Sequence, residues 1–63
     1  MSTEYHKSWI GLPAKQQAQN AMNHYNSTEE FLYALNDAYY SFYLDEEEYN
    51  EIIEEYNKLV RQL

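Results

Sequence analysis

The chain has 63 residues, with 11 acidic and 4 basic side chains, and its formal net charge at pH 7 is -7. A chain of this length buries only about 60% of the surface that it exposes when unfolded, which excludes large-cofactor enzymes and enclosed substrate pockets. The sequence contains no cysteine, so disulfides, thiolate metal sites and cysteine nucleophiles are excluded as well. Hydrophobic residues make up 44% and aromatic residues 17% of the chain, too much for a disordered acidic tail. We therefore expect one small, acidic, folded domain over residues 1–63.

The negative charge also bears on partners. Nucleic acids and anionic membranes carry dense negative charge and repel such a surface, so we expect no direct binding to either, and a basic protein as the partner. The sequence has no run of 18 apolar residues, and residues 1–7 have neither the basic start nor the apolar run of a signal peptide. These features predict a cytoplasmic protein.

The first predicted helix follows the only glycine and the only proline, Gly11 and Pro13. Proline suits the first turn of a helix, because the N–H that it lacks would have no partner there. Apolar residues then recur at helical spacing and predict a helix near 13–25. These are Ala14, Ala18, Ala21, Met22 and Tyr25.

The second predicted helix begins at Ser27, because Ser27 and Glu30 fit a capping box. Apolar residues continue at steps of three and four and predict one buried stripe on a helix near 27–42. They are Phe31, Leu32, Leu35, Ala38, Tyr39 and Phe42, and the stripe is buried whether the helix ends at Ala38 or continues to Phe42. Aromatic side chains also suit a pleated surface, so residues 39–43 fit a short extended segment as well. We favour the helix.

The third predicted helix covers 45–62. Asp45 can cap it, three glutamates occupy its first turn, and Lys58 and Arg61 lie near its negative end. Its apolar stripe consists of Tyr49, Ile52, Ile53, Tyr56, Leu59, Val60 and Leu63. Three amphipathic helices with short connections predict an all-α fold, a small three-helix bundle.

The acidic residues are concentrated in one part of the chain. Between Glu29 and Glu55 there are ten acids and no base: Glu29, Glu30, Asp37, Asp45, Glu46, Glu47, Glu48, Glu51, Glu54 and Glu55. The last seven, which we call the acidic strip, span about 15 Å of helix axis at about 1.5 Å per residue. This is one carboxylate per about 2 Å, whereas duplex DNA carries one charge per about 1.7 Å. The strip is either a binding site that imitates a phosphate backbone or a solvated helix face.

The tyrosines have two interpretations. Helical spacing places Tyr49 and Tyr56 in the core, whereas Tyr5, Tyr33, Tyr40 and Tyr43 include some that are exposed. Exposed tyrosines beside acids make a protein-binding face, and such a face also allows a homodimer.

The segment from His24 to Tyr40, followed by Asp45 to Glu55, resembles a module of the ArdA-type antirestriction proteins. The resemblance covers roughly half of the chain. It consists of a helix that opens with a Ser/Thr/Glu turn, a short aromatic link, and a helix of acids and aromatics. Those proteins are acidic, phage- and plasmid-borne DNA mimics that occupy the DNA groove of type I restriction–modification enzymes. The resemblance implies an inhibitor that acts in the cytoplasm of a bacterial host.

Other chemistry is poorly supported. His6 and His24 are the only histidines, and no carboxylate lies at a spacing that would complete a metal site on one face. The acidic strip lacks the central glycine of a calcium loop. Paired carboxylates such as Glu51 and Glu55 need a cleft to separate their pKa values. We expect no metal, no cofactor and no catalytic residue.

The sequence thus predicts a non-catalytic inhibitor that presents the acidic strip to a basic DNA-binding protein. This partner would be a restriction–modification enzyme or another host nuclease or regulator. Glu29, Glu30 and Asp37 are expected to extend the strip. The alternative is a helical adaptor or antirepressor that binds its partner through Tyr40, Tyr43 and their tyrosine-rich surroundings, with the acids serving solubility.

Overall fold

A computed structural model describes residues 4–62 and contains three α-helices. A short 3-10 helix η1 (Lys7–Trp9) precedes α1 (Ala14–His24), α2 (Thr28–Tyr40) and α3 (Glu46–Arg61). Residues 4–62 contain no strand, so the predicted all-α three-helix bundle is confirmed and the extended alternative at 39–43 is wrong. None of the three helices has the length and apolar content needed to cross a membrane.

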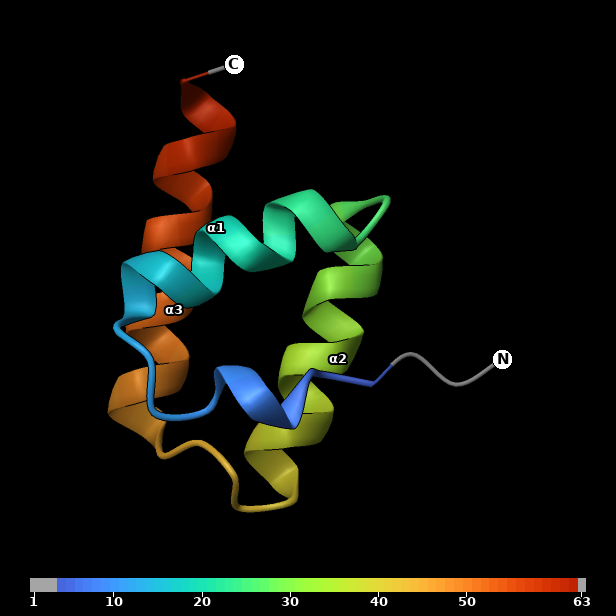
Figure 1. The fold of residues 1–63 in the computed structure, drawn as a ribbon, viewed down its shortest axis with the longest axis vertical. Helices are drawn as coiled ribbons and strands as arrows, with labels where there is room; N and C mark the ends of the chain where they lie inside the picture. The colour runs from blue at the N-terminus through green and yellow to red at the C-terminus, as the bar shows by residue number, and fades with distance from the viewer. Residues whose placement is uncertain (1–3, 63) are drawn as a thin grey trace.

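The three helices of the bundle are not all aligned with one another (Figure 1). The α2 and α3 helices run in opposite directions, and α1 lies across α3, on which it chiefly packs. The segment that carries η1 lies between the C-terminal end of α2 and the N-terminal end of α3, below α1 in Figure 1. Because α1 covers one side of α3 and α2 another, the side of α3 that carries most of its acids is left at the surface.

The core consists of small and aromatic side chains from all three helices. Phe31, Leu35 and Ile52 are fully buried, together with the alanines Ala18, Ala21 and Ala34, which let the helices approach closely. Two stacked ring pairs join α2 to α3: Phe31 with Tyr56 at 4.0 Å between centroids, and Tyr39 with Tyr49 at 4.7 Å. The Tyr49 hydroxyl also donates a hydrogen bond to Asn36 Oδ1.

The apolar stripe of α3 is only partly buried. Ile52 and Tyr56 are buried, and Tyr49, Ile53 and Leu59 are half-buried against the core. Val60 is exposed, because α3 extends beyond the helices that cover it (Figure 1). Leu63, the last residue assigned to the stripe, lies outside the described residues.

Both predicted N-caps are present. The Ser27 hydroxyl accepts a hydrogen bond from the Glu30 amide at 3.2 Å, and an Asp45 carboxylate oxygen accepts one from the Glu48 amide at 2.8 Å. The Glu30 carboxylate in turn accepts a hydrogen bond from the Asn26 amide at 3.3 Å. These bonds satisfy amides that have no partner within the helix, and they fix where α2 and α3 begin.

The N-terminal segment is attached to α1 by polar contacts. The Tyr5 hydroxyl donates to the buried Gln17 Oε1 at 2.6 Å, and Gln17 Nε2 donates to the Leu12 carbonyl at 2.9 Å. The Tyr25 hydroxyl donates to the Glu4 carbonyl at 2.8 Å. Every polar atom of the Gln17 side chain is therefore used, which makes its burial tolerable.

The end of α2 overturns one prediction. Phe42 was assigned to the buried stripe of a helix reaching residue 42, but α2 ends at Tyr40 and the Phe42 side chain is 94% exposed. The Tyr43 amide donates to the Ala38 carbonyl at 3.0 Å and the Phe42 amide to the Tyr39 carbonyl at 3.1 Å. This pair of bonds is a Schellman motif, which turns the chain through a left-handed residue, here Phe42 with φ 66°. The turn sends Leu44 into the core and Phe42 away from it.

Candidate protein-interaction surface

The structure places most of the acidic strip on the solvent side of α3. At about 100° per residue, Glu47, Glu51 and Glu54 fall on the side of the helix opposite to Ile52 and Tyr56. These three glutamates are exposed, as are Asp45 and Glu46, whereas Glu48 and Glu55 are half-buried. The strip is therefore a surface feature that the core does not need.

Two of the predicted acidic residues also have structural roles. Asp45 caps α3, and Glu30 closes the turn before α2. Negative charge at a helix N-terminus is favourable, so these carboxylates stabilise the helices whether or not they contact a partner. Glu46, Glu47 and Glu48 lie in the first turn of α3 and gain from the same effect, and Glu55 pairs with Lys58, so the acids of the strip that are free of such a role are Glu51 and Glu54.

Basic residues flank the strip at its C-terminal half. Lys58 Nζ lies 3.3 Å from Glu55 Oε1, which is the one ion pair within residues 4–62. A shallow depression of about 240 Å³ between α1 and α3 is lined by Ala14, Lys15, Lys58 and three glutamates of the strip, Glu51, Glu54 and Glu55. The crossing of α1 over α3 thus brings two lysines to the strip, and the density of unopposed charge is highest toward its N-terminal half.

The acids of α2 lie apart from this depression. Glu29 is exposed in the first turn of α2, and Asp37 borders a second shallow depression of about 160 Å³. That depression lies beside the N-terminal segment and is lined by Glu4, Tyr5, Lys7, Asp37, Ala38, Ser41 and Tyr43. Asp37 does not line the depression between α1 and α3 that holds Glu51, Glu54 and Glu55.

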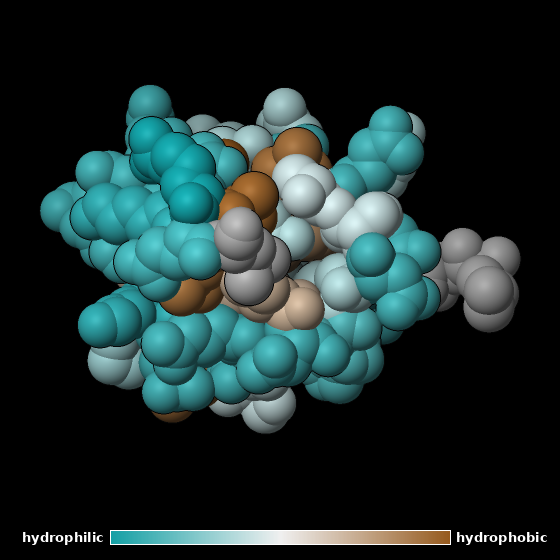
Figure 2. Space-filling model, turned by 90° about the horizontal axis from the view of Figure 1, so that it is seen from above, coloured by the Kyte–Doolittle hydropathy of each residue, from teal (hydrophilic) through white to brown (hydrophobic). Residues whose placement is uncertain are grey.

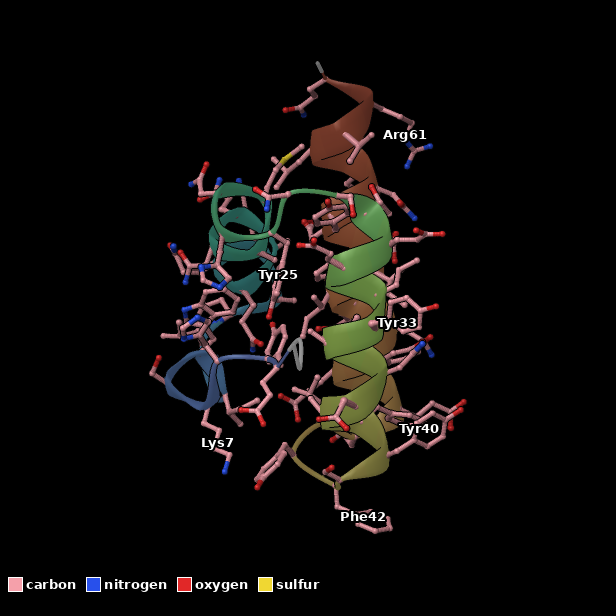
Figure 3. All side chains as sticks on the ribbon, turned by 90° about the vertical axis from the view of Figure 1, so that its right-hand side faces the viewer. Lys7, Tyr25, Tyr33, Tyr40, Phe42 and Arg61 are labelled. Carbon is pink, nitrogen blue, oxygen red and sulfur yellow. The ribbon has the colours of Figure 1, made fainter. Side chains whose placement is uncertain are left out.

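Aromatic residues gather where α2 turns toward α3. Tyr40 is 75% exposed, Tyr43 is 45% exposed and Phe42 lies between them in the chain. We call these three residues the aromatic corner. In Figure 3 Phe42 projects from the end of the molecule, and Tyr40 projects from the same end of α2. Tyr33, 70% exposed, lies further along α2 on the side from which Tyr40 projects (Figure 3).

The aromatic corner already holds a cation of the chain itself. Lys7 Nζ lies over the Tyr43 ring, 5.1 Å from its centroid. Such a cation–π contact is favourable because the ring face carries partial negative charge.

The opposite end of the molecule has a different surface. Seen from where α3 ends, the surface is mainly hydrophilic, with hydrophobic residues confined to a small central area (Figure 2).

Sequence reasoning selected Tyr40 and Tyr43 but missed Phe42 and Lys7. The sequence does contain a signal for the exposure of Phe42. A helix cap at Asp45 leaves room for a connection only if α2 ends several residues before it, which places Phe42 in that connection. The Lys7 contact depends on how the N-terminal segment crosses the molecule, and nothing local in the sequence indicates it.

The histidines and the buried tyrosines Tyr5 and Tyr25 gather around the N-terminal segment and the end of α1. His6 Nε2 and His24 Nε2 are 3.1 Å apart and share a hydrogen bond at the end of α1. Burial raises the pKa of Tyr25 to about 12 and, together with the neighbouring Tyr25, raises that of Tyr5. Within residues 4–62 no group of three or more His, Cys, Asp or Glu side chains is arranged to hold a metal ion.

Comparisons with family models, curated proteins and solved structures find no match to this chain. The acidic strip and the aromatic corner are therefore the features of the molecule that bear on its function.

Proposed function

We propose that this chain is a non-catalytic inhibitor that presents the acidic strip of α3 to the DNA-binding surface of a basic protein. The observation that carries the proposal is the outward placement of Glu47, Glu51 and Glu54, on the side of α3 opposite the buried Ile52 and Tyr56. Repulsion among these carboxylates lowers stability, only Glu47 gains from the positive end of the helix dipole, and no packing in the core requires any of the three. A basic partner surface removes this repulsion when it binds.

The partner class follows from the charge and its spacing. A surface that binds duplex DNA attracts about one negative charge per 1.7 Å of axis, close to the spacing along the strip. The resemblance to ArdA-type proteins supports a type I restriction–modification enzyme as the first protein to test. Such an inhibitor acts in the bacterial cytoplasm, where that enzyme protects the cell.

The test measures binding of the full chain to a purified type I methyltransferase at two salt concentrations, with and without duplex DNA. The variant carries Glu47→Gln, Glu51→Gln and Glu54→Gln, which keep side-chain size and helix propensity while removing three charges. Glu55 is left in place, because its partner Lys58 would otherwise be released. We expect binding to fall about tenfold or more, with a weaker dependence on salt.

A charge-matched control separates the strip from net charge. Glu4→Gln with Glu29→Gln removes two charges from outside α3, and it is compared with Glu51→Gln plus Glu54→Gln, which removes two charges from the strip. We expect this control to bind nearly as tightly as the unmodified chain. Equal weakening by both sets would mean that net charge alone matters. A complex that is insensitive to salt, to the three glutamine substitutions and to competing DNA would overturn the proposal.

The second candidate is a protein-binding adaptor that uses the aromatic corner. This candidate is favoured by the exposure of Tyr40. The centroid of its ring lies 5.4 Å from that of Tyr39, and most of the side chain is otherwise in solvent. If this is the function, Tyr40→Ala abolishes binding to the partner while the three glutamine substitutions have almost no effect. Measuring both variants against the same partner decides between the candidates.

A further inference from the structure

The backbone of Phe42 adopts a conformation that is unfavourable for phenylalanine. Its φ of 66° lies in the left-handed region, where the Cβ of an L-residue crowds the following carbonyl. Glycine is the usual residue at this position of a Schellman motif, and a bulky residue there is an outlier. With 94% of its side chain exposed, the phenylalanine gains almost no burial in return.

The turn also fixes the backbone that carries the ring. The hydrogen bonds from the Phe42 and Tyr43 amides to the carbonyls of Tyr39 and Ala38 fix the backbone on both sides of the ring. Leu44, two residues on, is buried and anchors the other end of the turn. Phe42 therefore projects from a backbone that is held in place (Figure 3), so a partner that buries the ring does not have to order the backbone as well.

The surroundings of Phe42 indicate what kind of surface can cover it. Acidic residues flank it in the chain on both sides, and Asp37, Asp45 and Glu46 are all exposed. Lys7, the one base among the residues that line the nearby depression, already lies over the Tyr43 ring. An incoming surface with Lys or Arg side chains gains from the acids and from the exposed face of Tyr40.

We propose that Phe42 is an apolar anchor that inserts into a hydrophobic pocket bordered by Lys or Arg on a partner protein. This deepens the proposed function, on which it rests for the basic character of the partner, and adds an apolar contact at the N-terminal end of the acidic strip. A second copy of the chain is the less suitable occupant. In a symmetric pair each Phe42 would meet the same acids, within molecules that each carry a net charge of -7.

The first experiment probes the anchor without an identified partner. A phage-displayed library of random peptides is selected against the immobilised full chain, with high-salt washes to remove peptides held by charge alone. The variants are Phe42→Ala and, as a matched control, Tyr33→Ala, which removes another exposed aromatic of α2. Circular dichroism establishes that both variants are folded.

We expect enriched peptides that combine an aromatic or aliphatic residue with Lys or Arg. They should bind Phe42→Ala about tenfold or more weakly and Tyr33→Ala unchanged, as expected for one dominant aromatic contact. Phe42→Leu should restore most of the binding, since it keeps apolar bulk. No enrichment, or equal binding to Phe42→Ala, would overturn the anchor.

The second experiment repeats the methyltransferase titration with Phe42→Ala. An apolar contact predicts the same fold-loss at both salt concentrations, whereas the glutamine variant changes the salt dependence itself. If the methyltransferase does not bind or DNA does not compete, the proposed function fails while the peptide result still decides the anchor. Sedimentation of the unmodified chain should show a monomer, and a dimer that Phe42→Ala abolishes would identify a second copy as the occupant instead.

Discussion

Replacing Phe42 with glycine should stabilise the fold. The left-handed conformation costs an L-residue about 1–2 kcal/mol, and glycine adopts it freely. Glycine loses more conformational entropy on folding, which opposes the gain by about 0.5–1 kcal/mol. Because the side chain is 94% exposed, its removal sacrifices almost no buried surface. The balance predicts that Phe42→Gly raises the free energy of unfolding by about 0.5–1 kcal/mol.

Urea unfolding followed by circular dichroism measures this change. With a slope near 1 kcal/mol/M for so small a domain, the midpoint should rise by roughly 0.5–1 M. The melting temperature should rise by roughly 2–8 °C. Phe42→Ala keeps the unfavourable φ and should change stability little, and Phe42→Asn should fall between alanine and glycine because asparagine tolerates this region.

The ordering of the three variants is the critical result. If Phe42→Gly lowers the midpoint, or if Phe42→Ala destabilises by more than about 1 kcal/mol, the ring makes contacts that stabilise the fold. The assignment of Phe42 as an unsupported, outward-facing side chain would then be wrong.

Two further predictions concern the core and the dependence on pH. Ile52→Ala should lower the free energy of unfolding by about 2–5 kcal/mol, because the Ile52 side chain is fully buried. Ile53 is only half-buried, so Ile53→Ala should lower the free energy of unfolding by less than about 2 kcal/mol. Equal losses for the two variants in urea unfolding would contradict the burial pattern. The pKa of Tyr25 rises from 10.0 in the unfolded chain to about 12 on folding, because burial favours the neutral phenol. The stability from this shift is therefore fully present below pH 10 and declines as the pH rises toward 12, so the urea midpoint should fall between pH 9 and pH 11. Tyr25→Phe should reduce this decline, and an unchanged decline would assign it to other groups such as Tyr5, whose pKa is also raised.

The helices could be predicted from the sequence because their signals are local. Ser27 and Asp45 cap the helices that follow them, and the apolar residues repeat with the helical period. The bounds differ from the predicted ones by no more than two residues, the largest difference lying at the end of α2. Phe42 was misplaced there because its spacing continues the α2 stripe, although the backbone has already left the helix.

The polar attachment of the N-terminal segment could not be predicted in the same way. Tyr5 and Gln17 are twelve residues apart, and their hydrogen bond exists only because the tertiary fold brings the segment before η1 to the side of α1 that carries Gln17. The same holds for Lys15, which lines a depression together with three acids of the strip because α1 crosses α3. Both arrangements depend on tertiary packing, which the apolar periodicity and the capping residues of single helices do not encode.

The corner between η1 and α1 gives the molecule a built-in optical probe. Trp9 is the only tryptophan. The centroid of its ring lies 4.7 Å from that of His6, 5.3 Å from that of Tyr5 and 5.8 Å from that of His24. Fluorescence of this one indole therefore reports whether the N-terminal segment is seated on α1, while far-ultraviolet circular dichroism reports the three helices. Coincident transitions in the two signals would mean that segment and helices unfold as one cooperative unit, and an earlier change in fluorescence would mean that the segment detaches first and leaves the helices folded.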